Sequence, residues 1–262
     1  RIISENASEV VAGVNGVRQE IRKSNVESIV RDDELTDNPS FQKMLQAEQL
    51  IDNNQDSIQA LELFLEAISE DESLLDTFNV LADRLVSTVT QEIDSSIQSG
   101  NVERALTGSQ LLNSDEMQNV VNEVLPNRSQ DLANFARLSE GKALTLRGIS
   151  ERNAGQVIES VNTLNEALEF ISESDAEYAQ VQFQLGLAYR DAGEQAESVD
   201  QYPRAREQLT QAISAFEEVI EFAASNATLV PQSRTEIASI RESDLPRINE
   251  YLSPVATPTP VP

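Results

Sequence analysis

The sequence predicts an all-α protein built from repeated helix pairs, and three observations carry this prediction. The composition favours helix, because Leu, Ile, Val, Ala, Glu and Gln predominate while the 262 residues include only nine glycines. Residues 147–156 (RGISERNAGQ) align with residues 185–194 (LGLAYRDAGE) at a shift of 38, with two glycines, an arginine and an alanine in common. Residues 160–170 then align with residues 212–222 at a shift of 52. Such a period is typical of a solenoid of antiparallel helix pairs.

Residues 1–35 are predicted to form an N-terminal amphipathic helix. Its apolar residues are spaced alternately by four and three, which is the a/d pattern of a coiled-coil seam. Gly13 and Gly16 lower its helix propensity, so we expect the helix only where its stripe is buried. The stripe can pack on the repeats of its own chain or on another subunit. In the second case the candidate subunit-interface residues are Ile3, Val10, Val14, Val17 and Ile21.

Residues 36–126 are predicted to contain two degenerate helix-pair units and one extra helix. The units cover residues 40–71 and 74–114, and the extra helix ends at Pro126. In the first unit, a small–aromatic–small spacing marks the packing face of the second helix, with the residues Ala60, Phe64 and Ala67.

Residues 127–226 are predicted to contain two better-defined units, at 130–173 and 176–224, and residues 195–208 form an insertion in the turn of the second. Their pattern resembles the tetratricopeptide repeat (TPR) family. The resemblance implies close helix crossing at Gly186 and Ala212, large side chains beside that crossing, and a turn at Gly193. The repeat-packing residues of these units are Gly148, Gly155, Leu185, Gly186, Tyr189, Gly193, Ala212, Phe216 and Val219.

The C-terminal part is predicted to hold a capping helix and a tail. Residues 227–252 carry an apolar stripe that would cover the last repeat, with a bend near Pro246. Residues 253–262 (SPVATPTPVP) are rich in Pro and Thr, a composition typical of an extended linker or stalk.

The absence of histidine and cysteine removes most catalytic and metal chemistry. A Ser-His-Asp triad, a Cys nucleophile and an ordinary zinc site are all excluded. Residues 52–57 (DNNQDS) start like an EF-hand loop, but Ser57 replaces its glycine and Leu63 its bidentate glutamate. An enzyme built only on carboxylates is the alternative, but no pair of carboxylates stands out, so we expect no catalytic residue, no metal site and no cofactor.

The formal charge of −26 restricts the partners. Phosphate contacts need clustered Lys and Arg, so binding to nucleic acid or to anionic lipid is not expected. No apolar run approaches the length of a membrane span, and direct membrane insertion is not expected either. A solvated surface explains the charge most simply, and a saline habitat or a cationic partner are the alternatives.

The expected function is non-enzymatic protein–protein contact. TPR-like proteins usually bind a peptide or helix along their concave face, where Arg152 and Arg190 would lie near acidic residues. We expect the partner to be other copies of the chain, joined head-to-tail through the N-terminal helix into a filament or surface layer. The alternative is an adaptor that binds a basic or apolar segment of another protein. Because the chain begins at Arg1, we expect a processed extracellular or cell-surface protein, with a cytoplasmic location as the alternative.

Overall fold

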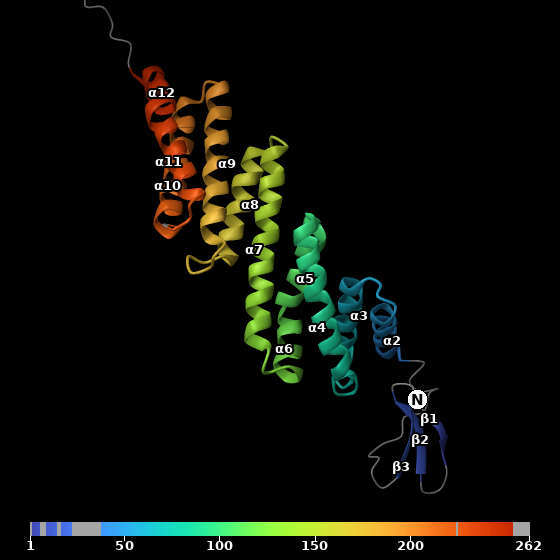
Figure 1. Cartoon of the computed structure of the whole chain (residues 1–262). Helices are drawn as coiled ribbons and strands as arrows, with labels where there is room; N and C mark the ends of the chain where they lie inside the picture. Colours follow the sequence, from blue (N-terminus) through green and yellow to red (C-terminus); the bar gives the residue numbers. More distant parts are fainter. Residues whose placement is uncertain (1, 6–8, 15–16, 23–37, 224, 254–262) are drawn as a thin grey trace, which may run out of the picture. The chain divides into compact units, whose positions relative to one another are not determined.

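The computed structural model of the chain describes residues 2–5, 9–14, 17–22, 38–223 and 225–253. From Pro39 to Leu252 every regular element among these residues is a helix, and short turns join the helices (Figure 1). The predicted helical class is therefore confirmed for this part of the chain. The helices are α2 (Pro39–Asp52), α3 (Ser57–Glu70), α4 (Leu74–Ser99), α5 (Val102–Asn113), α6 (Asp115–Val124), α7 (Ser129–Asn153), α8 (Val157–Phe170), α9 (Tyr178–Ser198), α10 (Tyr202–Phe222), α11 (Leu229–Ser239) and α12 (Leu245–Leu252), with a π-helical turn at Ile240–Asp244.

The chain divides into two compact units. Unit 1 takes residues 1–90 and 114–129, and so contains α2, α3, α6 and the first part of α4. Unit 2 takes residues 91–113 and 130–262, and so contains the end of α4, α5 and the helices from α7 onwards.

Four helix pairs, α2/α3, α4/α5, α7/α8 and α9/α10, close through the same kind of turn. Asn54, Gly100, Gly155 and Asp200 have φ values of 50°, 75°, 79° and 59°, and no other described residue has a positive φ. After each of them, the next backbone N–H donates to the carbonyl five residues earlier, at 2.8–2.9 Å. This bond is the Schellman closure of a helix, whose left-handed residue is usually Gly and sometimes Asn or Asp. Local sequence therefore determines where each pair turns.

In α7 and α9, glycines recur every seven residues and face large apolar side chains of the following helix. A Cβ atom added to Gly148 would lie 2.6 Å from Leu164 Cγ, and one added to Gly186 would lie 2.7 Å from Phe216 Cε1. These two contacts occupy equivalent positions in the aligned repeats, and the predicted close crossing at Gly186 is observed. Two further contacts of the same kind extend the series, Gly141 with Ile171 and Gly193 with Leu209.

The predicted roles of Gly193 and of residues 195–208 are wrong. Gly193 lies inside α9, and the turn comes seven residues later, at Asp200. The extra residues do not form a loop, because they lengthen the end of α9 and the start of α10. Seven residues are close to two helical turns of 3.6 residues, so this extension keeps the packed faces of both helices aligned.

Unit 2 contains two apolar cores that share α9. The first core joins α5, α7, α8 and α9 and includes Leu144, Leu164 and Leu185. The second joins α9 and α10 to the C-terminal helices and includes Phe183 and Phe216, whose rings meet edge to face at 5.6 Å. Each core is thus built mainly from helices that are neighbours in the chain.

The C-terminal helices of unit 2 pack on α10 through the predicted apolar stripe. Ile240 and Ile248 are completely buried in the second core, and Ile237 is nearly so. The π-helical turn comes just before Pro246, whose missing N–H interrupts the helical hydrogen-bond ladder. Of the predicted Pro/Thr-rich tail, residues 254–262 lie outside the described residues.

Unit 1 is built around α2 and α3. Met44 and Ala47 of α2 are completely buried together with the predicted packing residues of α3, Ala60, Phe64 and Ala67. The ring of Phe41 in α2 meets the ring of Phe78 in α4 edge to face at 5.6 Å. At Phe78 the backbone of α4 leaves helical geometry, with φ −109° and ψ 21°. α6 packs against α3.

The predicted N-terminal amphipathic helix is wrong for residues 2–5, 9–14 and 17–22, the part of residues 1–35 that the structure describes. Strands β1 (Ile2–Glu5), β2 (Glu9–Val14) and β3 (Val17–Arg22) form an antiparallel sheet in the order β1-β2-β3. The sequence contains a competing signal, since Asn15–Gly16 between Val-rich runs is a strong hairpin-turn sequence. β-Branched residues favour strands, and Gly13 and Gly16 weaken a helix.

Candidate protein-interaction site

Unit 1 is strongly acidic, and its few basic side chains are already paired. Residues 38–90 and 114–129 contain thirteen Asp and Glu residues against three basic ones. Lys43 Nζ lies 2.6 Å from a carboxylate oxygen of Glu70. The other two pairs are Arg84 with Asp52 and Arg128 with Asp83, each at 2.5 Å. Most carboxylates of this unit therefore have no cation of the unit to balance them.

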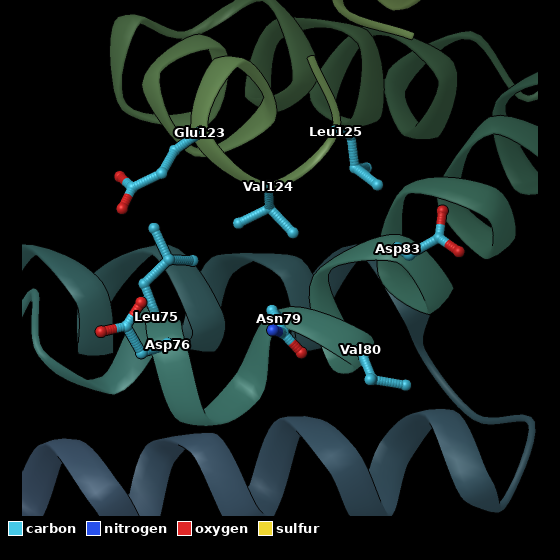
Figure 2. Close-up of a pocket in the computed structure, with 8 residues that line it drawn as sticks. All are labelled: Leu75, Asp76, Asn79, Val80, Asp83, Glu123, Val124 and Leu125. Carbon is cyan, nitrogen blue, oxygen red and sulfur yellow. The ribbon is translucent and has the colours of Figure 1, made fainter. Parts of the chain in front are cut away.

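A groove of about 400 Å³ lies between the first half of α4 and the end of α6. Its apolar lining comes from both helices, and Val80 on α4 leaves 66% of its surface exposed. Figure 2 shows Val124 and Leu125 directed from the end of α6 towards α4. The eight lining residues are Leu75, Asp76, Asn79, Val80, Asp83, Glu123, Val124 and Leu125.

Two carboxylates give this groove its charge. Asp76 and Glu123 lie at the same end of it, whereas Asp83 lies at the other end, where it pairs with Arg128 (Figure 2). Among the described residues, neither Asp76 nor Glu123 has a hydrogen-bond or ion-pair partner. A Lys or Arg side chain matches this surface, because its aliphatic stem covers apolar atoms while its charged head meets the carboxylates.

In unit 2, ion pairs link α7, α9 and α11 and involve both arginines that the sequence places in a groove. Arg152 Nε lies 3.8 Å from Asp191 on the next of these helices. Arg190 Nη1 lies 2.5 Å from Glu236, and Arg190 also pairs with Glu194 at 3.4 Å. Burial raises the pKa of both Asp191 and Glu194. The two arginines are thus engaged within the chain, and this face offers no open clamp for a partner's carboxylate.

The repeat-packing residues predicted in unit 2 all lie in α7–α10 or in the turns between them. Leu185, Ala212, Phe216 and Val219 are buried, with at most 4% of their surface exposed. Tyr189 is partly buried and packs against both cores. Gly155 stands in the turn after α7 with φ 79°.

The predicted subunit-interface residues all lie in strands. Val10 is the register partner of Ile21, and Val14 is the register partner of Val17, in the antiparallel pairing of β2 with β3. Ile3 falls at the register shift between β1 and β2. The predicted helical seam is therefore replaced by a strand pairing in which four of its five residues are register partners.

The sequence interpretation missed the acidic groove. The buried apolar residues of α4 follow a helical stripe through Ala82, Leu85 and Val89, and Val80 lies off that stripe. An apolar residue outside the buried stripe is the signal that could have found the groove. Its second wall comes from α6, some forty residues further on, and no local pattern indicates that packing.

Comparison with known proteins assigns no family to the chain: no protein-family model and no curated protein matches it. Within the described residues, no cluster of carboxylates has the arrangement that would hold a metal ion. No helix in the described part of the chain combines the length and apolarity needed to cross a membrane.

Proposed function

We propose that this chain is a non-enzymatic, TPR-like structural protein that acts by protein–protein contact. Its groove between α4 and α6 is the contact surface, and its ligand is a basic, partly apolar segment of another protein chain. The four helix pairs with a common turn support the repeat architecture. An extracellular or cell-surface location is part of the proposal, since a strongly acidic surface keeps assemblies soluble.

The observation that carries the proposal is the pair of unpartnered carboxylates beside an exposed valine. Asp76 and Glu123 gain a counter-ion only from outside, since every basic residue of the described part of unit 1 is engaged by other carboxylates. Val80 adds apolar surface that a monomer leaves in water. The proposed contact rests on this groove, because residues 2–5, 9–14 and 17–22, the described part of the predicted N-terminal helix, form strands.

Fluorescence anisotropy with two labelled amphipathic peptides tests the proposal. One peptide is made of Leu and Lys, and the other has Glu in place of Lys. The chain binds the first and not the second, and the double variant Asp76→Asn/Glu123→Gln binds it about five- to tenfold more weakly.

A matched variant separates binding of the basic peptide at the groove from its general attraction to a chain of charge −26. Glu62→Gln/Glu116→Gln removes the same charge from exposed positions of unit 1 outside the groove. This control keeps its affinity within about twofold. Equal losses in both double variants would show that the groove is not a binding site.

A further inference from the structure

The extended tip of the α9/α10 pair forms a second unusual surface. A pocket of about 210 Å³ lies beside it, lined by Ala192 and Ala196 of α9, Ile158 of α8 and Arg204 of α10. Val199, in the turn, also lines this pocket and leaves 59% of its surface exposed. The 14 residues that lengthen the pair thus create an apolar surface at its tip.

The lining of this pocket is opposite in charge to that of the acidic groove, because Arg204 is its charged residue. Arg204 forms no ion pair with any described residue, and its nearest polar contact is Gln201 Oε1 at 3.5 Å. Of the carboxylates near it, Glu197 accepts two bonds from Arg247, and Glu194 pairs with Arg190. Asp200 accepts the hydrogen bond of the Tyr202 hydroxyl, and neither Asp200 nor Glu207 lines the pocket. An exposed arginine without a carboxylate therefore stands beside an exposed valine.

The two surfaces match each other in charge and in apolar character. Val80 and Val199 are the only exposed aliphatic side chains among the large hydrophobic residues that the structure describes as exposed. Each lies beside charges that lack a partner, Asp76 and Glu123 in one case and Arg204 in the other. The groove thus supplies carboxylates that have no cation, and the tip supplies an arginine that has no carboxylate.

We propose that the acidic groove of one copy receives the α9/α10 tip of a second copy, with Val199 against Val80 and Arg204 between Asp76 and Glu123. This inference rests on the proposed function, since it names the ligand of the same groove. The contact joins two different surfaces and is therefore heterologous, so that it can add further copies head-to-tail.

Sedimentation velocity over a concentration series, at about 0.15 M salt to screen the overall repulsion, tests the contact. The unmodified chain associates as its concentration rises. Arg204→Glu weakens this association about tenfold or more, because it places three carboxylates together. Arg206→Glu is the matched control: this arginine is also exposed and without an ion pair, but it does not line the pocket, and its reversal changes association less than about threefold.

Reversing the charge of the groove in one variant and of the tip in another gives a more specific test of the contact. The variant Asp76→Arg/Glu123→Arg does not associate with itself, and an equal mixture of it with Arg204→Glu regains association, with the two variants alternating along the assembly. In that mixture each groove is complementary in charge to the tip of the other variant. Monomers in the mixture would overturn the inference.

The peptide experiment separates failure of this inference from failure of the proposed function. A chain that stays monomeric at all concentrations, yet binds the Leu/Lys peptide through Asp76 and Glu123, overturns the second copy as ligand and leaves the groove as a site for another protein. A chain that neither associates with itself nor binds the Leu/Lys peptide overturns both this inference and the proposed function.

Discussion

Replacing Gly186 by alanine tests the packing that defines the helix pairs. The added methyl would lie 2.7 Å from Cε1 of Phe216 and 2.9 Å from two further ring atoms. Phe216 is completely buried, and its ring is held edge to face against Phe183, so it cannot move without disturbing the core. Overpacking of this kind costs about 1–3 kcal/mol, and the higher helix propensity of alanine offsets about 0.5–1 kcal/mol. The mid-range values of the two effects leave a net loss of about 1 kcal/mol in the free energy of unfolding of Gly186→Ala.

Urea unfolding followed by tyrosine fluorescence measures this change in unit 2 alone. The chain has no tryptophan, and all four tyrosines lie in unit 2. The double variant Gly186→Ala/Phe216→Ala removes the ring that the added methyl would meet, and should lose about 1 kcal/mol less than the sum of its single variants. A Gly186→Ala chain as stable as the original would refute the close-contact explanation.

Three further predictions concern turns and ionised groups. The guanidinium of Arg137, which donates to both carboxylate oxygens of Asp175, lowers the pKa of Asp175 to about 2. The stabilisation by this ion pair is complete above the ordinary pKa near 4 and is lost as the pH falls towards 2. Asp175→Asn should therefore lower the free energy of unfolding by about 1–2 kcal/mol in urea at pH 7. It should also make that free energy less dependent on pH between pH 2 and 5. The hydrogen bond from Tyr202 to Asp200 raises the pKa of Tyr202 to about 12, and ultraviolet titration should show one tyrosine returning towards pH 10 in Asp200→Asn. Gly155→Ala meets no steric obstacle, but its φ of 79° should cost about 1 kcal/mol, and a stability equal to that of the unmodified chain would contradict the turn geometry.

The helical part of the chain was predictable because its decisive signals are local. Gly148 and Gly186 mark the same close crossing in two aligned repeats, and each faces a side chain that also aligns, Leu164 and Phe216. Glycine recurs at this position because a larger residue would collide with the facing side chain, even though the two repeats differ elsewhere. The alignment therefore located the packed faces of α7–α10.

The errors arose where two local signals competed. Residues 1–22 show a spacing of four and three, but the Asn15–Gly16 turn sequence and the β-branched residues favour a hairpin. Gly193 resembles a turn glycine by alignment, whereas the chain delays its turn to Asp200 and uses Gly193 for helix packing.

The acidic groove could not be predicted because it depends on packing between distant segments. Glu123 and Val124 approach Asp76 only because α6 returns to the first half of α4 (Figure 2). Net charge left a cationic partner as one alternative, but it could not show which carboxylates remain without a counter-ion.

Disulfide trapping tests most directly whether the groove contacts a second copy. The chain has no cysteine, so Val80→Cys and Val199→Cys each introduce a single thiol. When the two variants are mixed and mildly oxidised, we expect the mixed disulfide-linked dimer to form in clear excess over either homodimer. The matched mixture of Val80→Cys with Arg206→Cys should show no such excess. Equal yields in the two mixtures would contradict the proposed contact between the groove and the α9/α10 tip.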